Sequence, residues 1–234
     1  DANAPFSNPA GLGWIEHQEF TSGYSRLYLG LWDSSNLGTG FLGFTQPLRY
    51  RRKHMGSLGI GWLNFSLVQF YSEDTVSLAY GKELMPQWLP NFYGGLSAKI
   101  LKHTFKLGAD PTAQANPFFK TYGTQSSAID LDLGLLYRRP SGYSLGYHVS
   151  HVNRPNIGLK DPEPIDMAQE FGFAYHKPKS NITLDLFRQR KEQSIKAGAE
   201  RWVLDGKMAA RAGIIFGNHD LRQVTIGFGL RAQS

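Results

Sequence analysis

The sequence predicts an all-β protein, namely an antiparallel, up-and-down transmembrane β-barrel with a short amino-terminal segment ahead of its first strand. Three observations predict this class. Apolar residues alternate with polar or tiny residues in many short segments, and turn residues separate these segments. No run in the 234 residues approaches the roughly 20 consecutive apolar residues that a membrane-spanning helix requires. The alternation is most regular from Ile129 to Leu135, where Asp130, Asp132 and Gly134 face away from the apolar side chains.

Such alternation gives each strand one apolar face and one polar or glycine-lined face. A soluble β ligand binder would bury the apolar faces against a second sheet, whereas a membrane barrel turns them toward lipid. Trp and Tyr residues lie mostly near the expected strand ends, as Trp14, Trp88 and Trp202 do. This placement is typical of the water–lipid boundary, so it favours the membrane barrel over the soluble alternative.

We expect about twelve strands and no helix. In chain order they cover residues 18–31, 38–49, 56–66, 75–84, 91–107, 127–138, 142–152, 170–176, 181–190, 194–203, 207–216 and 221–232. Glycines recur on the polar face, as in Gly59 and Gly61, which indicates curvature or a crowded lumen.

The connections between these strands differ in length. The joins after the third, fifth and seventh strands are long, at 67–74, 108–126 and 153–169, while the even-numbered joins are short and rich in Pro and Gly. In an up-and-down meander all odd joins fall on one rim, which is the arrangement of outer-membrane barrels. We therefore expect the loops 108–126 and 153–169 to form the outward contact surface.

Basic residues gather on the short-turn rim. A solvated turn is the simplest interpretation of each one, but together they could meet anionic lipid head groups or an acidic protein partner. Nucleic acid is not expected, because the aromatic residues follow the lipid-facing periodicity instead of forming a stacking platform with these cations. The residues concerned are Arg51, Arg52, Lys53, Arg139, Lys177 and Lys179.

Ionisable residues also occur on the polar face of the strands. Their signs are opposite on neighbouring strands, so we expect them to line the lumen and pair across it; the alternative is a polar conduit or a seat for an internal segment. These residues are Lys99, Asp130, Asp132, Arg138, Asp185, Glu200 and Arg211.

The sequence predicts neither an enzyme nor a metal or cofactor site. His148, Ser150 and Asp130 are residue types that a hydrolase uses, but no G-x-S-x-G motif surrounds Ser150. His148 and His151 are expected to leave opposite faces of one strand, which is unsuitable for a shared metal. The chain has Cys 0, which excludes disulfides and thiolate ligands.

The amino terminus resembles a known family. Asp1-Ala2-Asn3-Ala4 followed by Phe6-Ser7-Asn8-Pro9-Ala10-Gly11-Leu12 is similar to the segment that precedes the barrel in the FadL/PorV group of bacterial outer-membrane proteins. The stretches 95–99, 130–138 and 198–202, the last followed by 211–213, resemble the PorV-type branch most closely.

The resemblance implies an integral outer-membrane barrel with an amino-terminal hatch inside its lumen. Residues 1–13 would be the hatch segment, with Asn8, Pro9, Ala10 and Gly11 at its gate, and residues 14–234 the barrel. The family typically has about fourteen strands, so we expect the chain to lack pieces at both ends.

Two functions follow from the resemblance. FadL-type members pass hydrophobic small molecules across the outer membrane, whereas PorV-type members serve a protein secretion complex. The expected partners are therefore outer-membrane lipid and either a hydrophobic small molecule or another envelope protein.

Overall fold

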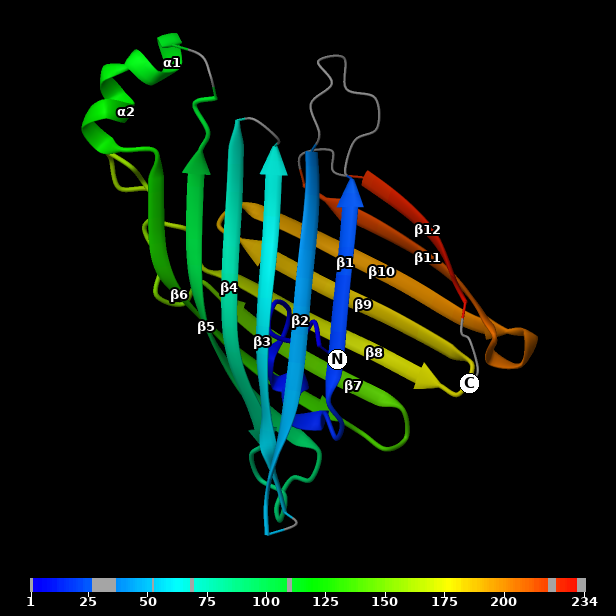
Figure 1. Cartoon of the computed structure of the whole chain (residues 1–234). Helices are drawn as coiled ribbons and strands as arrows, with labels where there is room; N and C mark the ends of the chain where they lie inside the picture. Colours follow the sequence, from blue (N-terminus) through cyan, green and yellow to red (C-terminus); the bar gives the residue numbers. More distant parts are fainter. Residues whose placement is uncertain are drawn as a thin grey trace.

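Twelve antiparallel strands form one sheet in strict sequence order in the computed structural model, which describes residues 2–26, 37–51, 53–67, 70–108, 111–218 and 222–230 (Figure 1). The strands are β1 (Glu19–Arg26), β2 (Leu37–Tyr50), β3 (Lys53–Leu67), β4 (Tyr71–Glu83), β5 (Phe92–Phe105), β6 (Gln125–Arg138), β7 (Tyr143–Ser150), β8 (Ala168–Lys177), β9 (Ser180–Gln189), β10 (Glu192–Val203), β11 (Met208–Gly217) and β12 (Arg222–Leu230).

Every strand expected from the alternation has a counterpart, which confirms the all-β, up-and-down prediction. The part of the first expected strand beyond Arg26 lies outside the described residues, as does the end of the last. The predicted length of one join was wrong: β4 begins at Tyr71, so the loop after β3 is short. The polar start of β4 is strand because Asp74 pairs with Asn64, whose side-chain amide donates to the Asp74 carboxylate at 2.9 Å.

The expectation of no helix was also wrong. The loop between β5 and β6 carries α1 (Pro111–Ala115) and α2 (Pro117–Tyr122). Asn116 caps α2 by accepting a hydrogen bond from the Phe118 amide at 2.9 Å, and Pro117 suits the first helical turn. Such short helices leave no periodic pattern to read. No helix of the described residues is long and apolar enough to cross a membrane.

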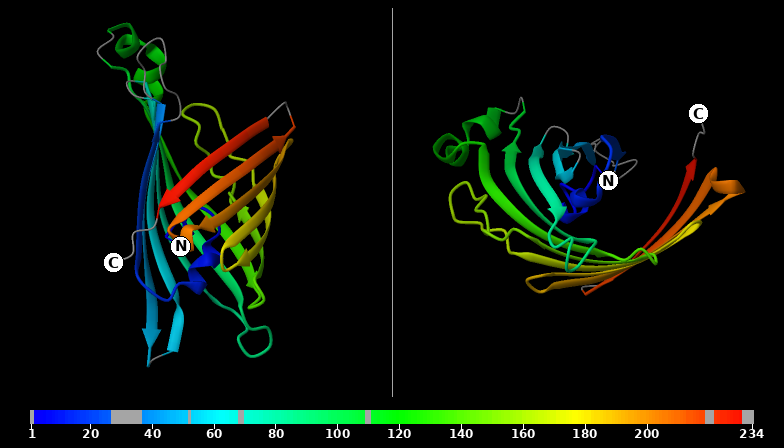
Figure 2. Two further views of the ribbon diagram at one scale, coloured as in Figure 1. Left: turned by 90° about the vertical axis from the view of Figure 1, so that its right-hand side faces the viewer. Right: turned by 90° about the horizontal axis from the view of Figure 1, so that it is seen from below.

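The sheet is strongly curved and forms a trough (Figure 2). β1 and β12 are its edges: in the described residues β1 pairs only with β2, and β12 only with β11. The sheet is thus not closed into a complete barrel within this part of the chain. The up-and-down order places the long loops 106–124 and 151–167 on one rim and the turns after β2, β6 and β8 on the other.

The two faces of the trough differ in character. The convex face exposes large apolar side chains in mid-strand, such as Ile60, Leu78 and Ile129 at 51%, 57% and 66% exposure. The concave face is covered in part by residues 2–15, here called the N-terminal segment, whose 3-10 helix η1 (Pro9–Trp14) lies against β3 to β6 (Figure 2). In the part of the chain that the structure describes, buried apolar residues are few, and Leu12 and Ile15 of this segment are among them.

Candidate functional site

Asn8 anchors the N-terminal segment on the concave face. Its Oδ1 accepts a hydrogen bond from the Ala10 amide at 3.0 Å and so caps η1, while its Nδ2 donates to the carbonyls of Leu135 and Tyr147 at 3.1 and 3.3 Å. Pro9 follows at the start of η1, where its missing N–H costs nothing. The structure therefore places the predicted Asn8 to Gly11 motif at the contact between the segment and strands β6 and β7.

A row of glycines forms the seat beneath this motif. Gly81, Gly95 and Gly134 are direct neighbours on β4, β5 and β6. A Cβ atom at Gly81 would lie 2.5 Å from the Pro9 carbonyl oxygen and 2.9 Å from a second backbone atom of the segment. At Gly95 and Gly134 it would collide with the Pro9–Ala10 backbone and with the Asn8 side chain. Only glycine lets the segment approach the sheet so closely.

Serine side chains of the sheet satisfy carbonyl groups of the segment. Ser77 and Ser97 donate to the Pro5 carbonyl oxygen at 3.0 and 3.4 Å, and Ser57 donates to the Ile15 carbonyl oxygen at 3.1 Å. All three serines are buried. Buried carbonyls that find such partners avoid the cost of desolvation, so the segment is specifically bound and does not merely fill space.

The position of Trp14 contradicts the prediction that this residue lies at a water–lipid boundary. It lies at the end of η1, where the Arg138 guanidinium packs over its ring at 4.2 Å and Tyr93 meets it edge to face. Trp202 likewise turns to the polar side, since its indole N–H donates to Glu200 at 2.9 Å. In both cases a specific polar partner outweighs the preference of Trp for a lipid boundary.

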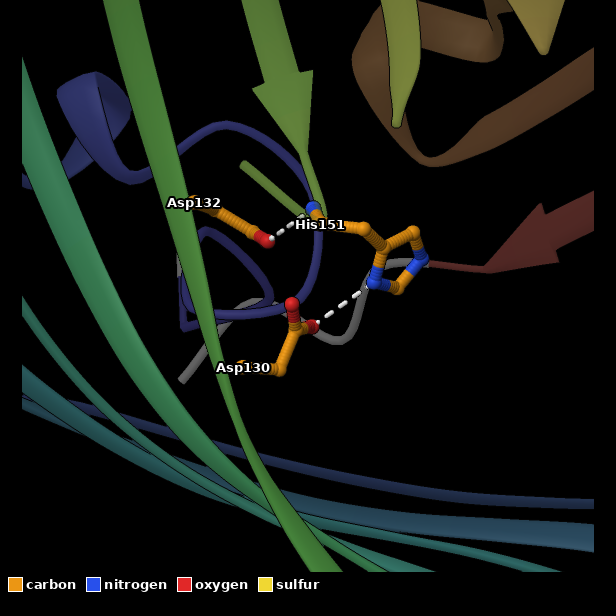
Figure 3. A group of neighbouring side chains, drawn as sticks. All are labelled: Asp130, Asp132 and His151. Carbon is orange, nitrogen blue, oxygen red and sulfur yellow. Dashed lines mark hydrogen bonds and ion pairs between the residues drawn. The ribbon is translucent and has the colours of Figure 1, made fainter. Parts of the chain in front are cut away.

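Three of the predicted lumen residues form one buried cluster where β5, β6 and the end of β7 meet. The Lys99 ammonium contacts the Asp132 carboxylate and lies 3.8 Å from Asp130 Oδ2. Both carboxylates are fully buried. His151 joins them from the end of β7: its Nδ1 is 2.9 Å from Asp130 Oδ2, and its backbone N–H donates to Asp132 Oδ1 at 3.2 Å (Figure 3).

The expected separation of the two histidines was wrong. His148 Nε2 lies 3.3 Å from Asp132 Oδ2, so both histidines contact the same carboxylate pair. The strand alternation stops at Ser150, and His151 has a left-handed backbone with φ of 58° that redirects its side chain. Sequence periodicity could not reveal this, because it assumed that β7 continued past this point.

The remaining lumen residues lie further along the concave face. Glu200 and Arg211 pair across β10 and β11 at 2.6 Å. Asp185 lines a cavity of about 350 Å³ together with Ser7 and Asn8 of the N-terminal segment. Glu200 and Arg211 therefore form the predicted kind of cross-strand pair, whereas Asp185 faces open space beside the segment.

The described residues of the predicted basic rim lie in turns or at strand ends, and three of them have local partners. Arg51 lies over the Tyr50 ring at 5.4 Å, Lys177 over the Tyr175 ring at 5.3 Å, and Lys179 is 3.8 Å from Asp205. Lys53 begins β3, Arg139 lies in the turn after β6, and Arg52 lies outside the described residues. Binding of lipid or an acidic protein by this rim stays a prediction.

The fold and the site together define a class of protein: a single up-and-down antiparallel sheet with an apolar convex face and a concave face that an internal segment covers in part, as in membrane β-barrels. No family model matches the chain, and no curated protein matches its sequence.

Solved structures with a similar fold do exist. The toluene transporter TodX from Pseudomonas putida superposes with a TM-score of 0.56 over 98% of this chain and 84% of its own, at 13% sequence identity. A TodX deltaS2S3 mutant, described as a monoaromatic hydrocarbon channel, gives a TM-score of 0.54 over 96% and 84%, at 12% identity. At such low identity the similarity establishes the fold alone.

Proposed function

We propose that this protein is an integral outer-membrane channel for hydrophobic small molecules, in which the N-terminal segment acts as the hatch. The observation that carries the proposal is the division between the two faces of the sheet. The convex face is apolar and exposed, and the concave face holds a segment bound by hydrogen bonds and a glycine seat.

The convex face has the pattern of a lipid contact. Ile60 on β3 pairs with Leu78 on β4, and the same row continues through Ala98 on β5 to Leu131 on β6. Ile60, Leu78 and Leu131 are exposed. A soluble monomer rarely exposes a contiguous apolar patch of more than about 300–600 Å², and an apolar belt across neighbouring strands is what surrounds a membrane barrel. These side chains favour the membrane proposal over the soluble β ligand binder.

The N-terminal segment has the properties of a hatch. Its 3-10 helix lies against β3 to β6 and Asn8 reaches β7, so the segment covers part of the concave face. It is held by a limited set of contacts: the amide of Asn8, the serine hydroxyls that reach Pro5 and Ile15, and the packing of Trp14 on Arg138. Each such contact contributes about 0.5–1.5 kcal/mol net, so the segment can be bound stably and still be released by a ligand.

The solved structures with this fold support transport over secretion. Both are described as a transporter or channel, for toluene or monoaromatic hydrocarbons. They lend no support to the PorV-type alternative, which rested on the sequence resemblance. We accordingly propose a small hydrophobic compound, and not a secreted protein, as the cargo.

Liposome uptake tests this function directly. The full chain is reconstituted into vesicles, and entry of a radiolabelled monoaromatic hydrocarbon is compared with empty vesicles and with a Gly81→Ala variant that loosens the hatch. Uptake above the empty vesicles, faster still in the variant, is the expected result. Correctly inserted protein that leaves uptake at the level of empty vesicles would disprove the channel.

A further inference from the structure

The buried cluster of Lys99, Asp130, Asp132, His148 and His151 is short of positive charge. Asp130 and Asp132 are both 0% exposed, and an unpaired carboxylate at such a site is very costly. Among the described residues, Lys99 is the only lysine or arginine within 4.0 Å of either carboxylate. An imidazole balances the second negative charge only when it carries an extra proton. Either a proton or a bound cation must do so.

One carboxylate oxygen of the cluster has no hydrogen-bond partner. Asp130 Oδ2 faces His151, but Asp130 Oδ1 makes no hydrogen bond although it is fully buried. This oxygen points toward the side of the cluster where Asp132 and His151 lie (Figure 3). Asp132 Oδ2, by contrast, contacts the Lys99 ammonium and lies 3.3 Å from His148 Nε2. A buried oxygen without a partner, as Asp130 Oδ1 is, commonly faces an ion or a water molecule.

We propose that Asp130, Asp132 and His151 bind a divalent metal ion of the zinc type. One donor atom from each of these residues can be chosen so that all three lie within 4.8 Å of one another. Two carboxylates and one imidazole suit Zn²⁺, which prefers four donors in a tetrahedron, and a water molecule can supply the fourth. A divalent ion would neutralise both carboxylates and give Asp130 Oδ1 its missing partner.

Lys99 acts as the competitor of the metal ion. Its ammonium contacts Asp132, one of the carboxylates that the ion would use, and two positive charges cannot share that place. Metal binding therefore displaces the ammonium from Asp132. A partly exposed His151 side chain, at 22%, offers the ion a route of entry from the loop side.

The position of the cluster gives the ion a structural task. Pairing between β6 and β7 stops at Leu133 and Val149, so residues 125–132 of β6 have no β7 neighbour. There the chain after β7 is held by one backbone hydrogen bond, from the Val152 amide to the Leu131 carbonyl at 2.9 Å, and by the Asn153 side chain, which accepts from the Leu131 amide at 2.9 Å and donates to the Ile129 carbonyl at 2.7 Å. A metal bound by Asp130, Asp132 and His151 would fasten the loop 151–167 to β6 just beyond the end of the β6–β7 ladder. This role is independent of any transport.

Metal titration of the full chain tests the proposal. Protein purified in detergent through a tag without histidine is stripped with a chelator, and Zn²⁺ binding is measured by calorimetry and elemental analysis, with Co²⁺ absorption to report the geometry. The expected result is one ion per chain. In His151→Ala and Asp130→Asn, affinity should fall by at least the roughly 10- to 100-fold that loss of an outer-shell partner costs. His103→Ala, which removes a histidine of β5 that contacts Tyr71, should bind as the wild type does.

Thermal unfolding of the wild type with and without Zn²⁺ provides a second measurement, since an ion that binds the folded state raises its unfolding temperature. This comparison needs no variant, so it tests whether the folded chain binds Zn²⁺ even if a substitution prevents folding. A wild-type chain that binds no stoichiometric Zn²⁺ would overturn the proposal and assign the second positive charge to a proton. Equal binding by His151→Ala would overturn it as well.

Discussion

Gly81→Ala should loosen the N-terminal segment from the sheet. The new Cβ would lie 2.5 Å from the Pro9 carbonyl oxygen, 2.9 Å from the Gly13 amide nitrogen and 3.0 Å from Leu12 Cβ. Two of these three atoms belong to backbone, which cannot turn aside as a flexible side chain does. Insertion of a methyl group into a closely packed contact costs about 1–3 kcal/mol. We therefore expect the fraction of molecules with a released segment to rise by roughly five- to 150-fold.

Thiol labelling measures this fraction, because the chain has Cys 0 and a single introduced cysteine is the only reactive thiol. Ile15→Cys places it at a position that is 3% exposed in the bound segment. The labelling rate is compared between Gly81→Ala and Gly227→Ala in this background. Gly227, on the concave face of β12, is the matched control, because an added Cβ there meets its nearest neighbour at an ordinary 3.8 Å. Equal labelling rates in two folded variants would refute the close-packed seat.

Three further predictions concern the segment, the charge cluster and the convex face. Asn8→Ala removes the cap of η1 and two hydrogen bonds to strand carbonyls, so it should weaken the segment by about 1–2 kcal/mol and accelerate thiol labelling; an unchanged rate would contradict the anchoring role. Lys99→Met removes the ammonium that the two buried carboxylates share and should destabilise the fold by about 3–5 kcal/mol in urea unfolding with chelator present, whereas Lys179→Met in an exposed pair should have no measurable effect. Leu78→Arg should cost about 2–4 kcal/mol for folding into lipid vesicles if this exposed side chain lies near the bilayer midplane, while Met85→Arg in the turn after β4 should be neutral; equal folding of the two variants would argue against lipid contact.

The strands could be predicted because their signal is local. The alternation along Ile129 to Leu135 arises from side chains that leave opposite faces of the same strand, and no distant residue is needed to create it. Consecutive pairing followed in turn from the short joins between strands. The start of β4 was missed because Asp74 and its polar neighbours are satisfied by residues of β3, which a local pattern does not show.

The site was only partly predictable. The Asn8 to Gly11 motif was found through resemblance, and the charged residues of the polar face were found through alternation. Their partners were not: Arg138 meets Trp14 instead of a carboxylate, and His151 reaches Asp130 only because the chain turns at the end of β7. Such contacts join residues that are far apart in the sequence or depend on a single backbone dihedral angle.

The sequence by itself determined the class of fold, the order of the strands and which face of each strand is apolar, because these properties depend on neighbours one or two residues apart. Only the tertiary structure decided that Gly81, Gly95 and Gly134 together form the contact surface for the N-terminal segment, and that two aspartates, two histidines and a lysine form one buried cluster. The physical reason is strand register. A glycine or a charge acquires its role from the residues beside it on adjacent strands, and those residues come together only when the sheet has formed.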